Sequence, residues 1–318
     1  ESLSRLSSLV KSGGFGALIE ASELFYADEI ASAAREILDR VQEVKVVIVS
    51  GPSASGKTTT TIKVGELLSE AGCSLVPLAV DNYFFDLDRH PRDIHGDYDF
   101  ETPQALDLEA INSDIRRLVA GERVDIPFYN FRKGRREGVS KTIALGEGDI
   151  LLIDSLHGMY EPMTEGVPEA MKFKLYVETL AQIKDEHGRF VRWSDIRMMR
   201  RMVRDTRFRN YNAEETLLHW RYVRRSELRY IISRLRSAHV IVNSYLPCEL
   251  PLMKAHLEPL IPGFLEMSAG HHDHGDAAER ALRLASIFKQ IPAWEDESVV
   301  PASSLLREFM GGSLYAYE

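Results

Sequence analysis

The chain has little cysteine, no long apolar run and no excess of positive charge. Its two cysteines, Cys73 and Cys248, are too few for a disulfide framework or a cysteine-based zinc cluster, so a reducing, cytoplasmic compartment is expected. No stretch approaches the roughly 18 apolar residues that span a bilayer, so no membrane association is expected. The formal net charge of −9 disfavours general binding to nucleic acid, and any anion site must therefore be local.

What the chain does have is enough apolar sequence for a sizeable core, with 318 residues of which 44% are hydrophobic. Short β-branched or apolar runs alternate with segments of helical periodicity, which predicts a parallel sheet flanked by helices. The strands are expected at residues 44–49, 74–80, 149–154, 173–177 and 240–242.

The rest of the chain falls into three further parts. Residues 1–42 are predicted to be a helical lead-in, with a breaker at 12–14 followed by a helix pair. Residues 124–131 and 142–145 are expected to form a hairpin around the basic tip 132–136. Residues 43–318 are expected to form one domain with a C-terminal helical extension. Because the chain begins with Glu, we expect it to be part of a longer product and residues 1–42 to be the junction.

The strongest motif is Gly51-Pro52-Ser53-Ala54-Ser55-Gly56-Lys57-Thr58, which fits the P-loop pattern and lies between a strand and a helix. Glycines let backbone N–H groups surround phosphate oxygens, lysine reaches the β- and γ-phosphates, and the threonine hydroxyl ligates Mg²⁺. The predicted nucleotide-binding residues are Gly51, Ser53, Ala54, Ser55, Gly56, Lys57, Thr58 and Thr59.

Two acids follow predicted strands. Asp154 ends an apolar run and suits the water shell of the metal beside Thr58, although an N-cap at a strand exit is the alternative. Asp81 is expected at the carboxyl edge of the sheet, where it would accept a proton from an attacking hydroxyl. The alternative for Asp81 is a turn residue with Asn82.

Four arginines, Arg197, Arg200, Arg201 and Arg204, share one face of a predicted helix. Such a stripe would close over a triphosphate and neutralise charge in the transition state; the alternative is a solvated face paired with Asp195 and Asp205.

Two further features of the sequence each allow two interpretations. Tyr129 would stack on a flat substrate, with Arg136 nearby, or it is a core aromatic. The run 271–274, His-His-Asp-His, reads as a loop rather than a metal site.

With these motifs in place, the chain from about Val44 to Tyr315 resembles the uridine kinase and phosphoribulokinase family, most closely its bacterial nucleoside-kinase-type members. The segments that carry the resemblance, besides the P-loop, are 78–84 (LAVDNYF), 96–103 (GDYDFETP), 126–131 (IPFYNF), 200–205 (RRMVRD) and 303–313 (SSLLREFMGGS).

The resemblance implies a five-stranded parallel P-loop kinase core with a small β-hairpin acceptor module and a helical, arginine-rich lid. It implies that Lys57, Asp81, Arg201 and Arg204 are catalytic and that Thr58 and Asp154 hold the metal. The implied substrate-binding residues are Asp81, Tyr83, Glu101, Tyr129 and Arg136.

The sequence departs from the family pattern at the acceptor site. Gly134 stands where uridine kinases present a histidine to the pyrimidine, Phe84 replaces a tyrosine, and Tyr211 replaces a lid arginine. Asp154-Ser155 replaces Glu-Gly. Loss of a residue that forms a hydrogen bond with the base can change which substrate is bound, whereas phosphoryl transfer itself is retained.

The leading hypothesis is a cytoplasmic kinase that uses ATP and Mg²⁺ to phosphorylate the primary hydroxyl of a nucleoside-like metabolite, most simply uridine or cytidine. One alternative is a kinase of a sugar or sugar phosphate. Another is a nucleotide-binding regulatory or RNA-associated module, against which the net charge argues. The expected partner is a small hydroxyl acceptor, and the sequence leaves self-association open.

Overall fold

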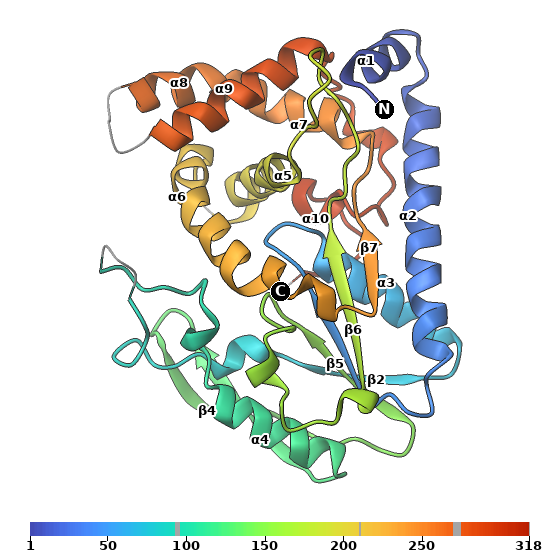
Figure 1. The fold of residues 1–318 in the computed structure, drawn as a ribbon, viewed down its shortest axis with the longest axis vertical. Helices are drawn as coiled ribbons and strands as arrows, with labels where there is room; N and C mark the ends of the chain where they lie inside the picture. The colour runs from blue at the N-terminus through green and yellow to red at the C-terminus, as the bar shows by residue number, and fades with distance from the viewer. Residues whose placement is uncertain (93–95, 210, 270–274, 318) are drawn as a thin grey trace.

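A computed structural model describes residues 1–92, 96–209, 211–269 and 275–317. At its centre is a five-stranded sheet, in the order β2-β5-β1-β6-β7, whose paired strands are all parallel (Figure 1). This confirms the predicted α/β fold. The strands are β1 (Val46–Ser50), β2 (Ser74–Leu78), β5 (Asp149–Asp154), β6 (Lys172–Glu178) and β7 (Val240–Asn243).

The register of this sheet brings three strand ends together. Val49 of β1 pairs with Asp154 of β5, and Leu78 of β2 pairs with Ile153. Because these strands are parallel, the loops after β1, β2 and β5 leave the sheet at the same edge. Residues far apart in the sequence therefore meet there.

The two faces of the sheet are covered by different elements. Val47 and Val49 belong to a core with the helices α2 (Phe15–Leu38) and α3 (Lys57–Glu70). The alternate residues Val46 and Ile48 belong to a second core, because successive side chains of a strand point to opposite faces. That second core also contains residues of α4 (Leu108–Val119) and of the strand β3 (Val124–Asn130).

The predicted hairpin forms a separate antiparallel pair of β3 and β4 (Arg135–Ile143). The second strand is longer than expected, since it begins at Arg135 rather than at residue 142. The chain turns at Gly134, whose φ of +63° is favoured by glycine. Arg135 and Arg136 of the basic tip therefore lie in the strand, and Arg135 pairs with Glu137 at 3.0 Å.

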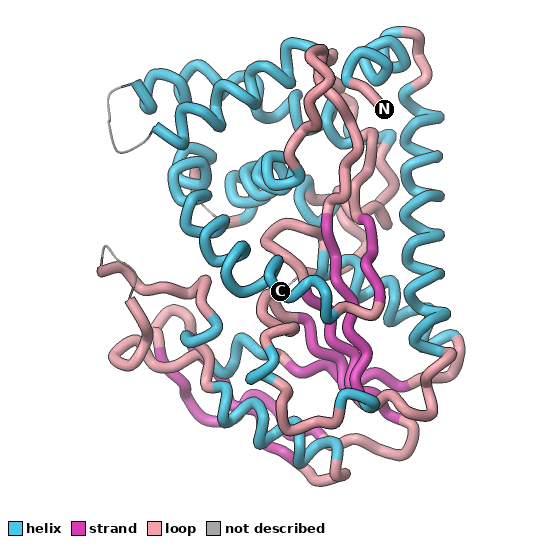
Figure 2. Tube along the Cα trace, viewed as in Figure 1, coloured by secondary structure: helices cyan, strands magenta, loops and turns pink. Residues whose placement is uncertain are grey.

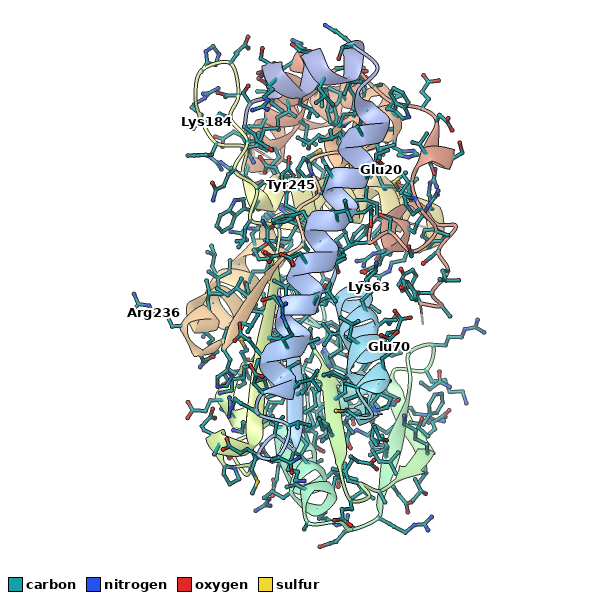
Figure 3. The ribbon with its side chains drawn as sticks, turned by 90° about the vertical axis from the view of Figure 1, so that its right-hand side faces the viewer. Glu20, Lys63, Glu70, Lys184, Arg236 and Tyr245 are labelled. Carbon is teal, nitrogen blue, oxygen red and sulfur yellow. The ribbon has the colours of Figure 1, made fainter. Side chains whose placement is uncertain are left out.

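The N-terminal part differs from the expected helix pair after the breaker. A helix, α1 (Leu3–Lys11), precedes the breaker, and a single helix, α2, continues for 24 residues after it. Figure 3 shows α2, in blue, running down from the upper part of the molecule and passing beside α3. Tyr26 of α2 is fully buried and its hydroxyl lies 2.8 Å from Thr60 Oγ1 of α3. The division of the chain at residue 42 stays a prediction.

The other half of the molecule is mainly helical, as the tube in Figure 2 shows. In the described part of the chain no helix is both long and apolar enough to cross a membrane. The run 271–274 lies outside the described residues. The helices are α5 (Trp193–Phe208), α6 (Ala213–Ser226), α7 (Glu249–Leu257), α8 (Ile261–Ala269), α9 (Gly275–Gln290) and α10 (Arg307–Met310).

Candidate active site

The P-loop joins β1 to α3, as the sequence predicts. Ala54 and Gly56 have left-handed φ angles of 58° and 88°, so the backbone folds back before the helix begins. A Cβ at Gly51 would lie 2.3 Å from the carbonyl oxygen of Val177, so only glycine fits there. The first N–H groups of α3 have no partner within the helix and carry its positive dipole end, which is an anion-binding arrangement.

Lys57 begins α3, and its ammonium donates to the carbonyl of Pro52 at 3.3 Å. Burial lowers the pKa of Lys57, and the charges of Asp154 and Glu308 oppose that shift. Asp81 is exposed to solvent, yet partial desolvation raises its pKa, and the charge of Lys57 opposes that rise. The lysine of the P-loop and the two predicted acids therefore act on one another in one site.

Asp154 lies at the end of β5 beside the P-loop. Burial raises its pKa to about 6; Lys57 and a hydrogen bond from the Thr58 hydroxyl lower it, whereas Glu308 and Asp81 raise it. The hydroxyl and the carboxylate are oxygen donors of the kind that Mg²⁺ prefers. This donor set fits the predicted metal site.

Two arginines of the stripe are partly exposed: Arg201 reaches the P-loop, and Arg204 reaches Glu308. Arg201 Nη1 donates to Ser53 Oγ at 3.1 Å and lies 3.5 Å from Glu101 Oε1. Arg204 Nη1 lies 3.7 Å from Glu308 Oε1. Both side chains are about 16–17% exposed. Arg201 thus lies between the P-loop and the predicted acceptor acid.

The other two arginines of the stripe are buried in ion pairs. Arg197 lies 2.8 Å from Glu178 and 2.6 Å from Glu227, and Arg200 lies 2.6 Å from Glu249. Neither arginine forms part of a solvated face. The sequence reasoning missed these partners because they come from β6, from the π-helical turn Glu227–Ile231 and from α7, far from α5 in the sequence.

The buried arginines also hold the shape of the P-loop. Arg197 donates to the carbonyl of Ser53 at 3.0 Å and Arg200 to that of Ser55 at 3.4 Å. Glu227 accepts from the N–H of Ser53 at 3.2 Å. Both polar backbone groups of Ser53 are therefore held by side chains from outside the loop.

Glu101 lies on the acceptor side of the P-loop. Its backbone carbonyl accepts a hydrogen bond from the Ser226 hydroxyl, which ties the loop to the end of α6. His157, a residue that the sequence reasoning did not single out, is also buried, and neither of its ring nitrogens has a hydrogen-bond partner among the described residues. Burial lowers the pKa of His157 to about 4, so this imidazole is neutral at pH 7.

Tyr129 packs in an aromatic cluster and is only 2% exposed. Its ring centroid lies 5.7 Å from that of Phe84 and 4.9 Å from that of Phe131. Its N–H donates to Asn82, the residue after Asp81, at 3.1 Å. The cluster therefore joins the hairpin to the segment that carries the predicted base, and stacking of Tyr129 on an acceptor stays a prediction.

Tyr83 and Arg136 are engaged within the protein. The Tyr83 hydroxyl donates to Asp114 at 2.8 Å and the side chain is buried. The Arg136 guanidinium donates to the carbonyls of Phe84 and Tyr83 at 2.9 and 2.7 Å and pairs with Asp107 at 3.1 Å. These contacts give both residues a structural role, and direct contact of either with an acceptor stays a prediction.

The packing around Gly134 explains why this position lacks the histidine that uridine kinases have there. A Cβ there would lie 2.1 Å from Leu87 Cδ1, and Leu87 N–H donates to the Gly134 carbonyl at 2.9 Å. Leu87 thus fills the space that a side chain at position 134 would need.

With this geometry established, comparison with known proteins identifies the family. The model of the Phosphoribulokinase / Uridine kinase family matches residues 46–250. Uridine kinase from Deinococcus deserti is 29% identical over 198 residues, which cover 62% of this chain and 86% of that protein. Uridine-cytidine kinase B from Dictyostelium discoideum is 27% identical over 198 residues, covering 62% of this chain and 73% of that protein.

Among solved structures, that of a possible uridine kinase from Bacillus stearothermophilus aligns with a TM-score of 0.42 and 16% identity, covering 65% of this chain and 98% of that one. The family match extends from β1 to the start of α7 and contains every predicted site residue. The chain belongs to the phosphoribulokinase / uridine kinase family and is an ATP-dependent P-loop kinase of a small-molecule substrate.

Proposed function

We propose that this kinase transfers the γ-phosphate of ATP to the primary hydroxyl of a nucleoside, with uridine and cytidine as the first candidates. The observation that carries the proposal is the register of the parallel sheet, which brings the ends of β1, β2 and β5 to one edge and with them Lys57, Asp81 and Asp154, whose charges act on one another there. Phosphoryl transfer needs a cation at the phosphates, an acid for the metal and a base for the acceptor hydroxyl, and these three side chains supply them.

Each residue has a distinct task in this proposal. The N–H groups of the P-loop and Lys57 bind the β- and γ-phosphates and orient them. Arg201 and Arg204 balance the charge that spreads over the transferred group. Asp81 accepts the proton of the attacking hydroxyl. Its raised pKa brings its basicity nearer to neutral pH, where a general base works best.

Thr58 and Asp154 would hold Mg²⁺. A Mg²⁺ ion held by these two residues would supply positive charge that neutralises part of the phosphate charge. The Thr58 hydroxyl lowers the pKa of the Asp154 carboxyl, so the two oxygen donors lie near each other in the site.

The charges of the acceptor module favour a neutral nucleoside over a sugar phosphate. Lys133 and Arg135 both pair with Glu137, at 3.0 Å each, and Arg136 pairs with Asp107. All three basic groups are therefore paired within the protein, with Lys133 and Arg135 sharing one carboxylate. A phosphorylated acceptor would need cations that are not already paired.

The experiment is ADP release measured with separate acceptors: uridine, cytidine, purine nucleosides, free pentoses and pentose phosphates. The proposal expects turnover with at least one nucleoside and kcat/KM at least about 100-fold lower for the pentose phosphates, as expected when binding groups are mismatched by about 2.7 kcal/mol. Turnover with pentose phosphates alone would instead support the phosphoribulokinase-like alternative, and would overturn the nucleoside assignment.

A further inference from the structure

The C-terminal segment Ser304–Tyr317 lies against the start of α3, next to the P-loop. Glu308 of α10 accepts hydrogen bonds from Thr59 through Oε2, at 3.2 Å from the backbone N–H and 2.7 Å from the hydroxyl. The hydroxyl of Tyr317 lies 3.1 Å from Thr59 Oγ1. Thr59 was predicted to bind the nucleotide, yet its donors are already used within the protein.

The surroundings of the Glu308 carboxylate are those of a bound phosphate. Thr59 is the third residue of α3, so its N–H is one of the orphan donors at the positive end of the helix. Arg204 lies 3.7 Å away, and the charge of Glu308 acts on Lys57. An anion thus already occupies part of the place where the P-loop binds a polyphosphate.

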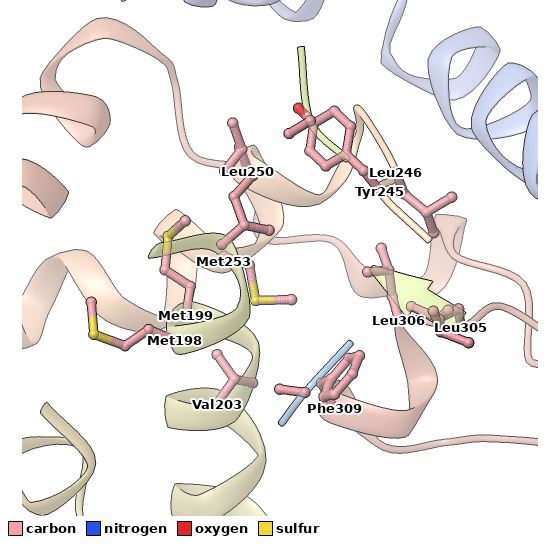
Figure 4. Packing of buried hydrophobic residues seen from close by; sticks show 14 of the residues in the cluster. Met198, Met199, Val203, Tyr245, Leu246, Leu250, Met253, Leu305, Leu306 and Phe309 are labelled. Carbon is pink, nitrogen blue, oxygen red and sulfur yellow. The ribbon is translucent and has the colours of Figure 1, made fainter. Parts of the chain in front are cut away.

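The backbone that presents Glu308 is firmly packed. Leu305, Leu306 and Phe309 are fully buried and lie beside Val203 of α5 and its neighbours (Figure 4). A Cβ at Gly56 would lie 2.5 Å from Leu305 Cδ1, which shows how closely the segment approaches the P-loop. Because the backbone is packed, release of the carboxylate is a movement of the Glu308 side chain away from Thr59.

We propose that Glu308 is a built-in competitor of the nucleotide: its carboxylate occupies a phosphate position at the N-terminus of α3, and ATP must displace it to bind. The inference rests on one part of the proposed function, namely that the P-loop binds ATP, and does not depend on the identity of the acceptor. It assigns the C-terminal segment, which lies beyond the family-matched residues 46–250, a role in setting the affinity for ATP.

The energetic consequence follows from competition at one position. Glu308 and a phosphate cannot both accept from Thr59, and two anions this close repel each other. The free energy needed to withdraw Glu308 is subtracted from the binding energy of ATP, so the apparent affinity is lower than that of the open site. Removing the charge of Glu308 removes the repulsion and leaves only a neutral, weaker hydrogen-bond acceptor.

The experiment compares Mg·ATP and Mg·pyrophosphate binding to the wild type and to Glu308→Gln by calorimetry. The proposal expects both ligands to bind the variant about tenfold more tightly, a change of about 1.4 kcal/mol. Glu295→Gln is the matched control, since it removes the same charge from an exposed position in the same extension and leaves both affinities unchanged. Equal or weaker binding to Glu308→Gln would show that Glu308 does not compete.

A second measurement uses the wild type and does not depend on the variant folding. Amide hydrogen exchange at residues 307–313 is expected to become faster when Mg·ATP binds, because α10 loses its contact with Thr59. Slower exchange there would mean that the segment closes on the nucleotide, which overturns the proposal. Neither readout involves an acceptor, so a failure to phosphorylate nucleosides would refute the proposed function while leaving this result intact.

Discussion

At the scale of single residues, the chemistry at the P-loop follows from local sequence, whereas its supporting contacts do not. The motif around Lys57 and the acids at the ends of two strands were predictable, because strand ends of a parallel sheet meet at one edge. The roles of Glu227 and Glu308 were not. Each approaches the loop from a segment more than 150 residues away, and no local pattern records such a pairing.

His157 gives a residue-scale prediction about pH. Its folded pKa of about 4 lies below its ordinary value of 6.5, so the native state binds fewer protons than the unfolded state between these values. The stability that His157 contributes is therefore complete above about pH 6.5 and is lost as the pH falls toward 4. Chemical denaturation at pH 7 and pH 5 is expected to show a smaller loss for His157→Gln than for the wild type. An equal loss in both proteins would contradict this assignment.

At the scale of elements, the strands were predicted well and the helices less well. Short apolar runs mark buried parallel strands, and the structure has all five near the expected positions. Two expectations failed, the helix pair after residue 14 and the late start of β4. A continuous α2 is stabilised by packing on α3 and β7, and the β4 residues 135–141 are mostly polar and exposed, so apolar patterning could not identify them.

The element-scale prediction concerns the attachment of α5 to the P-loop. Arg197→Met leaves Glu178 and Glu227 buried without their shared cation, which is expected to cost about 3–5 kcal/mol of unfolding free energy. Arg189→Met is the control, because that arginine is 70% exposed in its pair with Asp185. Such an exposed pair contributes less than about 1 kcal/mol to the free energy of unfolding. Denaturant titration of both variants measures the difference. Similar losses would mean that the buried cluster does not support the fold.

At the scale of the whole molecule, segments on both sides of the family-matched region complete one core. Phe15 of α2 and Phe288 of α9 belong to the same cluster of buried residues as Val49 of β1. Sequence reasoning treated the two ends as a lead-in and an extension, because helical periodicity shows that a helix has an apolar face but not what that face meets.

The prediction at this scale tests whether the C-terminal extension is structural. Phe288→Ala is expected to lower the unfolding free energy by about 3–5 kcal/mol, because it leaves a cavity in a fully packed region. Leu282→Ala, on the same helix, changes a residue that is 58% exposed and is expected to cost less than about 0.5 kcal/mol. A small effect of Phe288→Ala in thermal or denaturant unfolding would mean that α9 is not part of the cooperative core.

The most direct test of the account is the turnover of Asp81→Asn. The amide keeps the shape of the side chain but cannot accept the proton, so kcat for the best nucleoside acceptor is expected to fall by about 10²–10⁴-fold. The affinity for Mg·ATP is expected to stay within about twofold, and Asp88→Asn, an exposed neighbour on the same segment, to behave like the wild type. Unchanged turnover by Asp81→Asn would contradict the central claim that Lys57 and Asp81 serve one phosphoryl-transfer site.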